Sequence, residues 1–165
     1  LDMARADAVK RKAVDLPALI EKTLPLFKLH FRDKNIRLEK TLSPVPRVLG
    51  DEHQLQQVLM NVIINSIHAM ESEENVLSIS LFNRGSGEGK VDFIILRIKD
   101  NGKGILEEHL DRIFDPFFTT KRQGGSGLGL FIVHRLIEAH GGNITVESSV
   151  NVGTTCTITL PVLED

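Results

Sequence analysis

The stretch DPFFTTKRQGGSGLGLFIVHRLIEAHGG, residues 115–142, is the most informative part of this chain about its fold. A segment with three glycines in residues 125–129 leads into an apolar helix, which we expect to run from about Ser126 to His140. Glycines let backbone N–H groups approach a ligand closely, and a helix N-terminus adds the positive end of its dipole. The segment predicts a phosphate site, although a tight connection without a ligand gives the same pattern.

The length and composition are those of one globular domain: 165 residues, 41% hydrophobic and 25% charged. A net charge of −2 without a basic block argues against a nucleic-acid partner. No apolar run is long enough to span a bilayer and no signal peptide opens the chain, so it is predicted to be cytoplasmic. The single cysteine, Cys156, lies in a strand pattern and is expected to be a buried structural thiol.

The spacing of apolar residues predicts a mixture of helices and strands. Asp15 and Pro17 begin a helix, which Pro25 is expected to bend. Residues 1–14 have a helical composition with little apolar stripe, which suits the end of a preceding helix. Alternating patterns predict strands over residues 36–42, 76–82, 91–99, 143–148 and 154–160.

A helix with a polar stripe is predicted from Asp51, its N-cap, to about Met70. Gln54, three residues after the cap, completes a capping-box pattern. One narrow face carries only amide and imidazole side chains, while apolar residues occupy most of the rest of the helix. The residues of this face are Gln54, Gln57, Asn61, Asn65 and His68. Buried amides need partners, so the face either bonds to neighbouring backbone or lines a polar cavity, and five aligned polar groups favour the cavity.

The sequence DNGKGI, residues 100–105, follows the predicted strand that ends at Lys99. An aspartate before Asn-Gly is, by itself, a common turn signal. Here Gly102 and Gly104 open the backbone around a carboxylate that leaves an apolar strand. Such a carboxylate is well placed to accept a hydrogen bond from an exocyclic amine, for example that of adenine.

Together these segments resemble the catalytic, ATP-binding domain of bacterial sensor histidine kinases. That superfamily also holds the ATPase domains of type II topoisomerases, mismatch-repair proteins and heat-shock chaperones. Four family motifs occur in order: the asparagine box QVLMNVIINSIHAM (57–70), the first glycine box DNGKGI, the phenylalanine box IFDPFFTTK (113–121) and the second glycine box GGSGLGL (124–130). The closing strand GTTCTITLP follows, and the PFFTTK lid is most similar to the nitrogen-regulator-like branch.

The resemblance covers nearly all of residues 15–165 and implies a two-layer α/β sandwich of the Bergerat type. In that fold three helices cover one face of a mixed, mostly antiparallel sheet, and ATP binds between the asparagine-box helix and a mobile lid. Residues 1–14 would be the end of an upstream helix from the dimerisation and phosphoacceptor domain. Because the chain opens with Leu1, we expect it to be a piece of a longer protein.

The resemblance also implies which residues surround ATP and Mg²⁺. Asn65 would coordinate the metal, Asn61 would lie beside it, and Lys121 would reach the γ-phosphate from the lid, so these three are the implied catalytic residues. Asp100 would accept a hydrogen bond from the adenine amine. The implied nucleotide-binding set is Asn61, Asn65, His68, Asp100, Gly102, Gly104, Ile105, Phe117, Thr120, Lys121, Gly125, Gly127, Leu128, Gly129 and Thr154. Phe114, Phe117 and Phe118 are similar to lid anchors, with core packing as the alternative for each.

The chain departs from the family pattern at several positions. His68 stands where many relatives have a lysine that faces a phosphate. Whether a charged side chain contacts the phosphate at this position is therefore left open. Ser66 replaces the usual alanine and Cys156 a common phenylalanine, both expected to be silent packing changes. Asn61 stands where the hydrolysing branches have a glutamate, and an amide cannot act as a general base. This favours phosphoryl transfer to a protein side chain over hydrolysis.

None of the six histidines is followed by an acidic residue, as the family's phosphoacceptor is, so the acceptor is expected upstream of this chain. The resemblance therefore implies an ATP-dependent protein histidine kinase domain of a two-component system. Its implied partners are ATP, its own dimerisation domain and the receiver domain of a response regulator. The parent would be a homodimer through the missing helices and this fragment a monomer, with anchoring of the parent in the inner membrane left open.

Three other functions remain open from the sequence. The first is an ATP-hydrolysing conformational switch like the chaperone and topoisomerase relatives, which the absent glutamate disfavours. The second is a serine-directed kinase of the anti-sigma-factor type, which shares the same motifs. The third is a pseudo-enzyme that only binds nucleotide, which the intact motifs disfavour.

Overall fold

The computed structural model describes residues 11–120 and 125–164, and at its centre is a five-stranded sheet in the order β2-β4-β5-β7-β6. The strands are Ile36–Leu42 (β2), Asn75–Arg84 (β4), Phe93–Asp100 (β5), Asn143–Ser149 (β6) and Gly153–Pro161 (β7). β2 and β4 pair in parallel, and the other neighbours pair antiparallel. All five predicted strands are confirmed, with ends that differ by at most two residues from the expected ones.

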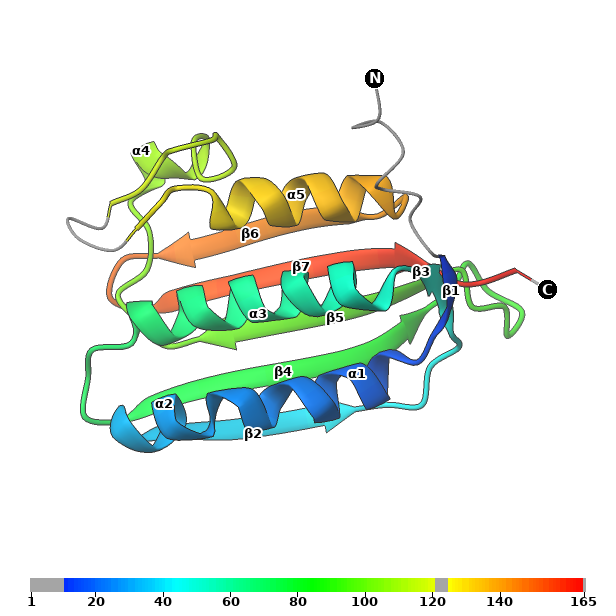
Figure 1. Ribbon diagram of the computed structural model, residues 1–165, viewed down its shortest axis with the longest axis horizontal. Coiled ribbons are helices and arrows are strands. Elements are labelled where there is room, and N and C mark those ends of the chain that lie inside the picture. The colour runs from blue at the N-terminus through cyan, green and yellow to red at the C-terminus, as the bar shows by residue number, and fades with distance from the viewer. Residues whose placement is uncertain (1–10, 121–124, 165) are drawn as a thin grey trace, which may run out of the picture.

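Helices cover one face of this sheet, as Figure 1 shows. α1 (Leu16–Thr23), α3 (Glu52–Ala69) and α5 (Gly129–Ala139) lie side by side on it. α1 continues through a 3₁₀ turn, η2 (Leu24–Phe27), into α2 (Lys28–Asp33). The predicted two-layer α/β sandwich with a mixed, mostly antiparallel sheet is therefore confirmed. A short helix after β5, α4 (Glu107–Leu110), has no counterpart among the predicted elements.

The core lies between the helices and the sheet. Side chains of β4 alternate between the two faces, so that Leu77, Ile79 and Leu81 are fully buried under the helices. From the helix layer, Ile67 of α3 and Ile137 of α5 are buried to the same degree. None of the helices in residues 11–120 and 125–164 is both long enough and apolar enough to cross a membrane.

The first helix begins and bends where the sequence predicts. The Asp15 carboxylate accepts a hydrogen bond from the Ala18 N–H at 3.0 Å and caps α1, with Pro17 in the first turn. Pro25 lies in η2, at the point where α1 gives way to a tighter turn. Because proline has no N–H to donate, a regular α-helix cannot continue through this position.

Two short strands pair outside the main sheet. β1 (Lys12–Val14) runs antiparallel to β3 (Val48–Gly50), and Val14 faces Val48 with both side chains buried. The helical prediction for residues 1–14 is therefore wrong for residues 12–14, because backbone pairing with a distant segment outweighs local helix propensity. Residues 1–10 lie outside the part that the structure describes.

The asparagine-box helix, α3, ends at Ala69 with Met70 as its C-cap, close to the predicted end. Its predicted N-cap is confirmed, since the Asp51 carboxylate accepts the Gln54 N–H at 3.1 Å. The other half of the capping box differs from the prediction. The Asp51 N–H donates to the ring of His140, at the far end of α5, at 3.1 Å.

The helix of the second glycine box, α5, begins three residues later than the predicted start at Ser126. Gly127 has φ +72°, which breaks a right-handed helix, and its carbonyl accepts the N–H of Phe117 at 2.9 Å. The predicted stop is confirmed. Gly141 is left-handed, and the Gly142 N–H donates to the Ile137 carbonyl at 3.0 Å, as in a Schellman motif.

Candidate functional site

The carboxylate of Asp100 is the centre of the candidate site. Asp100 is the last residue of β5 and is only 4% exposed. The Gly102 N–H donates to its Oδ1 at 2.9 Å. Burial raises the pKa of Asp100, while donation from the Gly102 N–H, the Ser66 hydroxyl and the Thr154 N–H acts in the opposite direction.

The turn after Asp100 is packed tightly against its neighbours. A Cβ on Gly102 would lie 2.5 Å from the Ala69 carbonyl oxygen, and the Lys103 N–H donates to that oxygen at 2.9 Å. Gly104 has φ +73°, and a Cβ there would lie 2.2 Å from the Ser149 carbonyl oxygen. The turn therefore bridges the end of α3 and the β6–β7 hairpin, and only glycine fits at these two positions.

Ser148 joins two of the predicted site residues, and the sequence analysis missed it. Its Oγ accepts the Ile105 N–H at 2.8 Å, lies 2.8 Å from Thr154 Oγ1, and donates to the Gly153 carbonyl at 3.0 Å. With that hydrogen given to Gly153, Ser148 can only accept from Thr154, so the Thr154 hydroxyl is the donor of their bond. A serine near the end of a strand has no sequence signal that separates this role from ordinary solvent exposure.

The polar stripe of α3 faces the start of α5. Asn61 Nδ2 donates to the Gly129 carbonyl at 3.4 Å, and Asn65 Nδ2 lies 3.9 Å from where a Cβ of Gly129 would be. The stripe is less buried than predicted, because Gln57 and His68 are exposed while Gln54, Asn61 and Asn65 are half-buried. Bonding to neighbouring backbone, one of the two alternatives, is thus observed for Asn61.

Three phenylalanines lie in the segment before the second glycine box, and two of them pack against neighbouring residues. The half-buried Phe114 packs against the core, with its ring 5.0 Å from that of His134 in α5. Phe118 lies 5.4 Å from the His109 ring, and the Arg112 guanidinium lies 4.6 Å from the Phe118 centroid. Phe117 is 74% exposed at φ +68°. Phe114 therefore follows the core alternative, and Phe117 does not pack inside the described fold.

The remaining predicted residues lie on or beside this segment. Thr120 is exposed, and Gly125, Gly127, Leu128 and Gly129 are half-buried where the chain enters α5. Lys121, predicted to contact the γ-phosphate, lies outside the described residues. The structure thus brings Asp100, Gly102, Gly104, Ile105 and Thr154 into one cluster. Asn61, Asn65 and Gly129 form a second cluster.

The side chains present fit a magnesium nucleotide better than a metal held by protein alone. Among the residues that the structure describes, no group of three or more His, Cys, Asp or Glu side chains could hold a metal ion. Mg²⁺ usually takes one or two protein oxygens and completes its shell with phosphates and water. The half-buried Asn65 amide suits that arrangement. Cys156 is buried, and burial raises its pKa to about 12, so its predicted structural role is confirmed.

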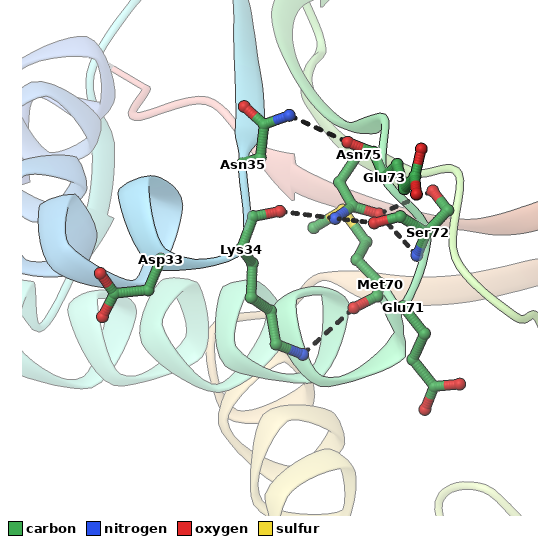
Figure 2. Close-up of a pocket in the computed structure, with 8 residues that line it drawn as sticks. All are labelled: Asp33, Lys34, Asn35, Met70, Glu71, Ser72, Glu73 and Asn75. Atoms are coloured by element: carbon green, nitrogen blue, oxygen red, sulfur yellow. Dashed lines mark hydrogen bonds between the residues drawn. The ribbon is translucent and has the colours of Figure 1, made fainter.

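A separate open pocket of about 500 Å³ lies between the end of α2 and the α3–β4 loop, shown in Figure 2. Lys34 Nζ donates to the carbonyls of Ile67 and Met70 at 2.8 and 3.1 Å, which caps the end of α3. Asn75 Nδ2 donates to the Lys34 carbonyl, and Asn35 Nδ2 to that of Glu73. These bonds join structural elements to one another, and none of the predicted site residues lines this cavity.

Comparison with known proteins finds a family match that covers the residues of the candidate site. Residues 50–164 match the family described as histidine kinase-, DNA gyrase B- and HSP90-like ATPase. The chain is 37% identical over 163 residues to sensor histidine kinase ZraS of Escherichia coli K12, covering 98% of this chain and 33% of that protein. The chain thus spans about a third of the length of the curated relatives that it matches.

Solved structures show the same architecture. The catalytic domain of histidine kinase ThkA superimposes with a TM-score of 0.80 at 31% identity, covering 92% of this chain and 95% of that one. Full-length ShkA in complex with AMPPNP gives 0.80 at 26% identity, over 96% and 33%. ThkA in complex with the response regulator protein TrrA gives 0.75 at 28% identity, over 93% and 42%.

Proposed function

This chain belongs to the family of histidine kinase-, DNA gyrase B- and HSP90-like ATPases and corresponds to the ATP-binding catalytic domain of sensor histidine kinases, and we propose that it transfers the ATP γ-phosphoryl group to a histidine outside this chain. The observation that carries this proposal is the buried carboxylate of Asp100. This carboxylate is 4% exposed and accepts the Gly102 N–H at one oxygen, and because a carboxylate has about four acceptor positions it can also accept a hydrogen bond from an adenine amine.

The adenine end of the proposed site consists of the Asp100 cluster. Asp100 accepts from the exocyclic amine, while Gly102 and Gly104 let the backbone approach the base. Ile105 and Thr154 are held against each other through Ser148, which gives the base a rigid wall. The Thr154 hydroxyl hydrogen points to Ser148, so towards the base or an intervening water this oxygen acts as an acceptor.

The phosphate end of the proposed site lies between α3 and α5. Asn65 is the proposed Mg²⁺ ligand, with Asn61 and His68 beside the phosphates. Phe117, Thr120 and Lys121 belong to the lid. The backbone of Gly125, Gly127, Leu128 and Gly129 would surround the phosphates at the start of α5, where unsatisfied N–H groups and the helix dipole favour negative charge.

The proposed reaction depends on positioning and charge compensation. Asp100 and the phosphate-binding backbone would fix the nucleotide at its two ends, and an imidazole from the dimerisation domain would attack the γ-phosphorus in line. An N–P bond would form as the bond from the γ-phosphorus to the bridging oxygen breaks, and ADP would leave with that oxygen. Mg²⁺, which Asn65 would hold, would supply compensation for the negative charge of the phosphates. Lys121 would compensate the charge of the γ-phosphate from the lid. The Asn61 amide donates to Gly129 and cannot take a proton from water, which favours transfer over hydrolysis.

The proposed partners follow from the same reaction. Residues 15–165 would be the catalytic domain, and residues 1–14 would connect it to a dimerisation domain that carries the acceptor histidine. The phosphoryl group would then pass to a response regulator, consistent with the solved complex of the similar ThkA with TrrA. The parent would be a homodimer through the dimerisation helices, and this chain by itself a monomer.

Two experiments test the proposal. The first is calorimetric titration of the 165-residue chain with AMPPNP, with and without Mg²⁺, and with GTP as control. We expect metal-sensitive binding of the adenine nucleotide only, and absence of binding by a folded sample would refute a nucleotide site. The second adds labelled ATP and a separate dimerisation hairpin of a sensor histidine kinase. An acid-labile label supports histidine transfer, whereas acid-stable phosphoserine or steady phosphate release would contradict it.

A further inference from the structure

We propose that Asn101 is a positioning residue for the adenine end of the site, because its side chain replaces the backbone in pairing with β4 and so lets the glycine turn close around the Asp100 carboxylate. The inference rests on the proposed function, in which Asp100 reads the purine amine. Asn101 belongs to the DNGKGI motif, but the family resemblance gives it no role in binding. Its side chain is exposed, so a substitution there does not disturb the packing of the core.

The Asn101 side chain makes two hydrogen bonds to the start of β4. The ladder between β4 and β5 ends with Leu77 opposite Asp100. One position further, the Val76 N–H donates to Asn101 Oδ1 at 2.8 Å, and Asn101 Nδ2 donates to the Glu74 carbonyl at 2.9 Å. A side-chain amide offers an acceptor and a donor, as a peptide unit does. It therefore satisfies the backbone of β4 beyond the point where the β5 backbone leaves the sheet.

The departure of the backbone from the sheet shapes the carboxylate site. Directly after Asn101 the chain turns, and the Gly102 N–H points back to Asp100 Oδ1 at 2.9 Å, as in an Asx turn. An N–H that stayed in the strand would be directed to a neighbouring strand and not to this carboxylate. The orientation of the Asp100 carboxylate therefore depends on the turn that begins at Asn101.

The turn is also attached to two other elements, in both cases through its backbone. The Lys103 N–H donates to the Ala69 carbonyl at the end of α3 at 2.9 Å, and the Lys103 carbonyl accepts the Asn151 N–H of the β6–β7 hairpin at 2.8 Å. A side-chain substitution leaves these backbone bonds in place. Loss of the Asn101 side chain would thus release the turn from β4 while it stays attached to α3 and the hairpin.

This release should affect the amine of the base more than the rest of the nucleotide. A hydrogen bond weakens steeply when its donor and acceptor are no longer aligned, so the contact of Asp100 with the amine depends on the direction of the carboxylate. The phosphate end of the proposed site is built from α3 and α5, to which Asn101 makes neither of its two bonds to β4. Asn101 should therefore govern the preference for a purine that carries the amine.

The test measures Asn101→Ala by calorimetry with ADP and with purine riboside 5′-diphosphate, in which hydrogen replaces the exocyclic amine. We expect the variant to lose affinity for ADP by about tenfold, as for a weakened hydrogen bond to a charged acceptor, while its affinity for the amine-free nucleotide stays within about twofold of the parent. Asn101→Ser is the second variant in case the alanine variant folds poorly. Its hydroxyl is too short to reach both Val76 and Glu74, so it should show the same change.

A double-mutant cycle with Asp100→Asn tests whether Asn101 acts through the carboxylate. Asp100→Asn by itself should remove the preference for ADP over the amine-free nucleotide. Adding Asn101→Ala should then lower the ratio of the two affinities no further, because the two residues act on the same contact. A further fall of this ratio in the double variant would show that Asn101 acts by another route, which overturns the inference.

Asn83→Ala is the matched control. Asn83 is an exposed residue of β4 whose Nδ2 donates to the Pro44 carbonyl at 3.3 Å, so the variant removes a similar amide bridge elsewhere on the same strand. It should leave both affinities unchanged.

The possible failures are distinguishable. Equal loss of affinity for both nucleotides in the Asn101 variants would show a structural role only, and unchanged affinities would remove the role. Either result overturns the inference while leaving the proposed function intact. Equal affinities of the parent chain for both nucleotides would show that Asp100 does not read the amine, which also overturns the inference. If the parent chain binds neither nucleotide, the proposed function fails and the inference with it.

Discussion

The backbone N–H of Asp51 donates to Nε2 of His140 at 3.1 Å, joining the first residue before α3 to the last turn of α5. Because an N–H can only donate, Nε2 is an acceptor, and Nδ1 carries the hydrogen that bonds to the Leu136 carbonyl at 2.7 Å. His140 is buried. The two helices that carry the proposed phosphate-binding residues are thereby fixed to each other at the ends away from those residues.

Replacement of His140 by alanine should destabilise the fold without changing nucleotide affinity. The variant leaves the Asp51 N–H without its partner, so we expect a loss of about 1–3 kcal/mol in the free energy of unfolding. Urea unfolding followed by circular dichroism measures this loss. The exposed His53 on α3 is the control, and His53→Ala should change stability by less than about 0.5 kcal/mol. Equal stabilities of the two variants would show that the bond contributes nothing.

Alanine substitutions at Gly104 and Gly89 should distinguish the stability cost of close packing from that of backbone strain. Their φ values are +73° and +74°, but a Cβ on Gly104 would lie 2.2 Å from the Ser149 carbonyl oxygen, whereas Gly89 has nothing within 4 Å. Gly89→Ala should cost only the strain of a left-handed alanine, about 1 kcal/mol. Gly104→Ala should cost about 3 kcal/mol or more and weaken ADP binding, because the turn after Asp100 must move. Thermal unfolding and calorimetry of both variants test this, and similar losses would contradict the packing.

Substitution of Asn65 should uncouple nucleotide binding from Mg²⁺. The parent is expected to bind AMPPNP more tightly with the metal than without it, and Asn65→Ala should reduce that difference to less than about twofold, since a protein oxygen ligand is lost. Titrations at several Mg²⁺ concentrations measure the effect. Gln57→Ala, on the same face of α3 but exposed, is the control and should keep the metal dependence. If nucleotide binding by Asn65→Ala still depended on Mg²⁺, the polar face of α3 would have a structural role and would not bind the metal.

The buried carboxylate of Asp100 should make both binding and stability depend on pH. Burial raises its pKa above the ordinary value of 3.8, so the folded protein takes up this proton at a higher pH than the unfolded chain does. The contribution of Asp100 to stability is thus greatest at low pH and declines as pH rises through the folded pKa.

The pH dependence of ADP binding should have the opposite sign to that of stability. Only the ionised carboxylate of Asp100 accepts a strong hydrogen bond from the adenine amine. Purine riboside 5′-diphosphate carries the same diphosphate as ADP but has hydrogen in place of the amine, so the titration of the phosphates cancels in the ratio of the two affinities. The ratio of the affinity for ADP to that for purine riboside 5′-diphosphate should fall as pH is lowered through the pKa of Asp100. Asp100→Asn should lose the preference for ADP at every pH while it remains folded. A ratio that is flat with pH in the parent would show that ionised Asp100 does not read the amine.

The elements of this fold were largely predictable because their signals are local. The strands β2, β4, β5, β6 and β7 alternate along a few residues, and Asp15 and Asp51 cap helices within three residues of their own positions. Gly141 ends α5 through bonds that span a single turn. The family motifs likewise place Asp100 at the end of a strand and Asn65 on a helix, so the candidate site was predictable as a set of residues.

Only the tertiary structure decided which distant groups meet. The pairing of β1 with β3 joins two three-residue segments that carry no periodicity, and the bond from Asp51 to His140 joins residues 89 positions apart. The contacts of Ser148 with Ile105 and Thr154 are equally invisible in the sequence. A serine has the same local preferences whether its hydroxyl meets water or a group on another strand, because its partner is selected by packing between elements and not by neighbours along the chain.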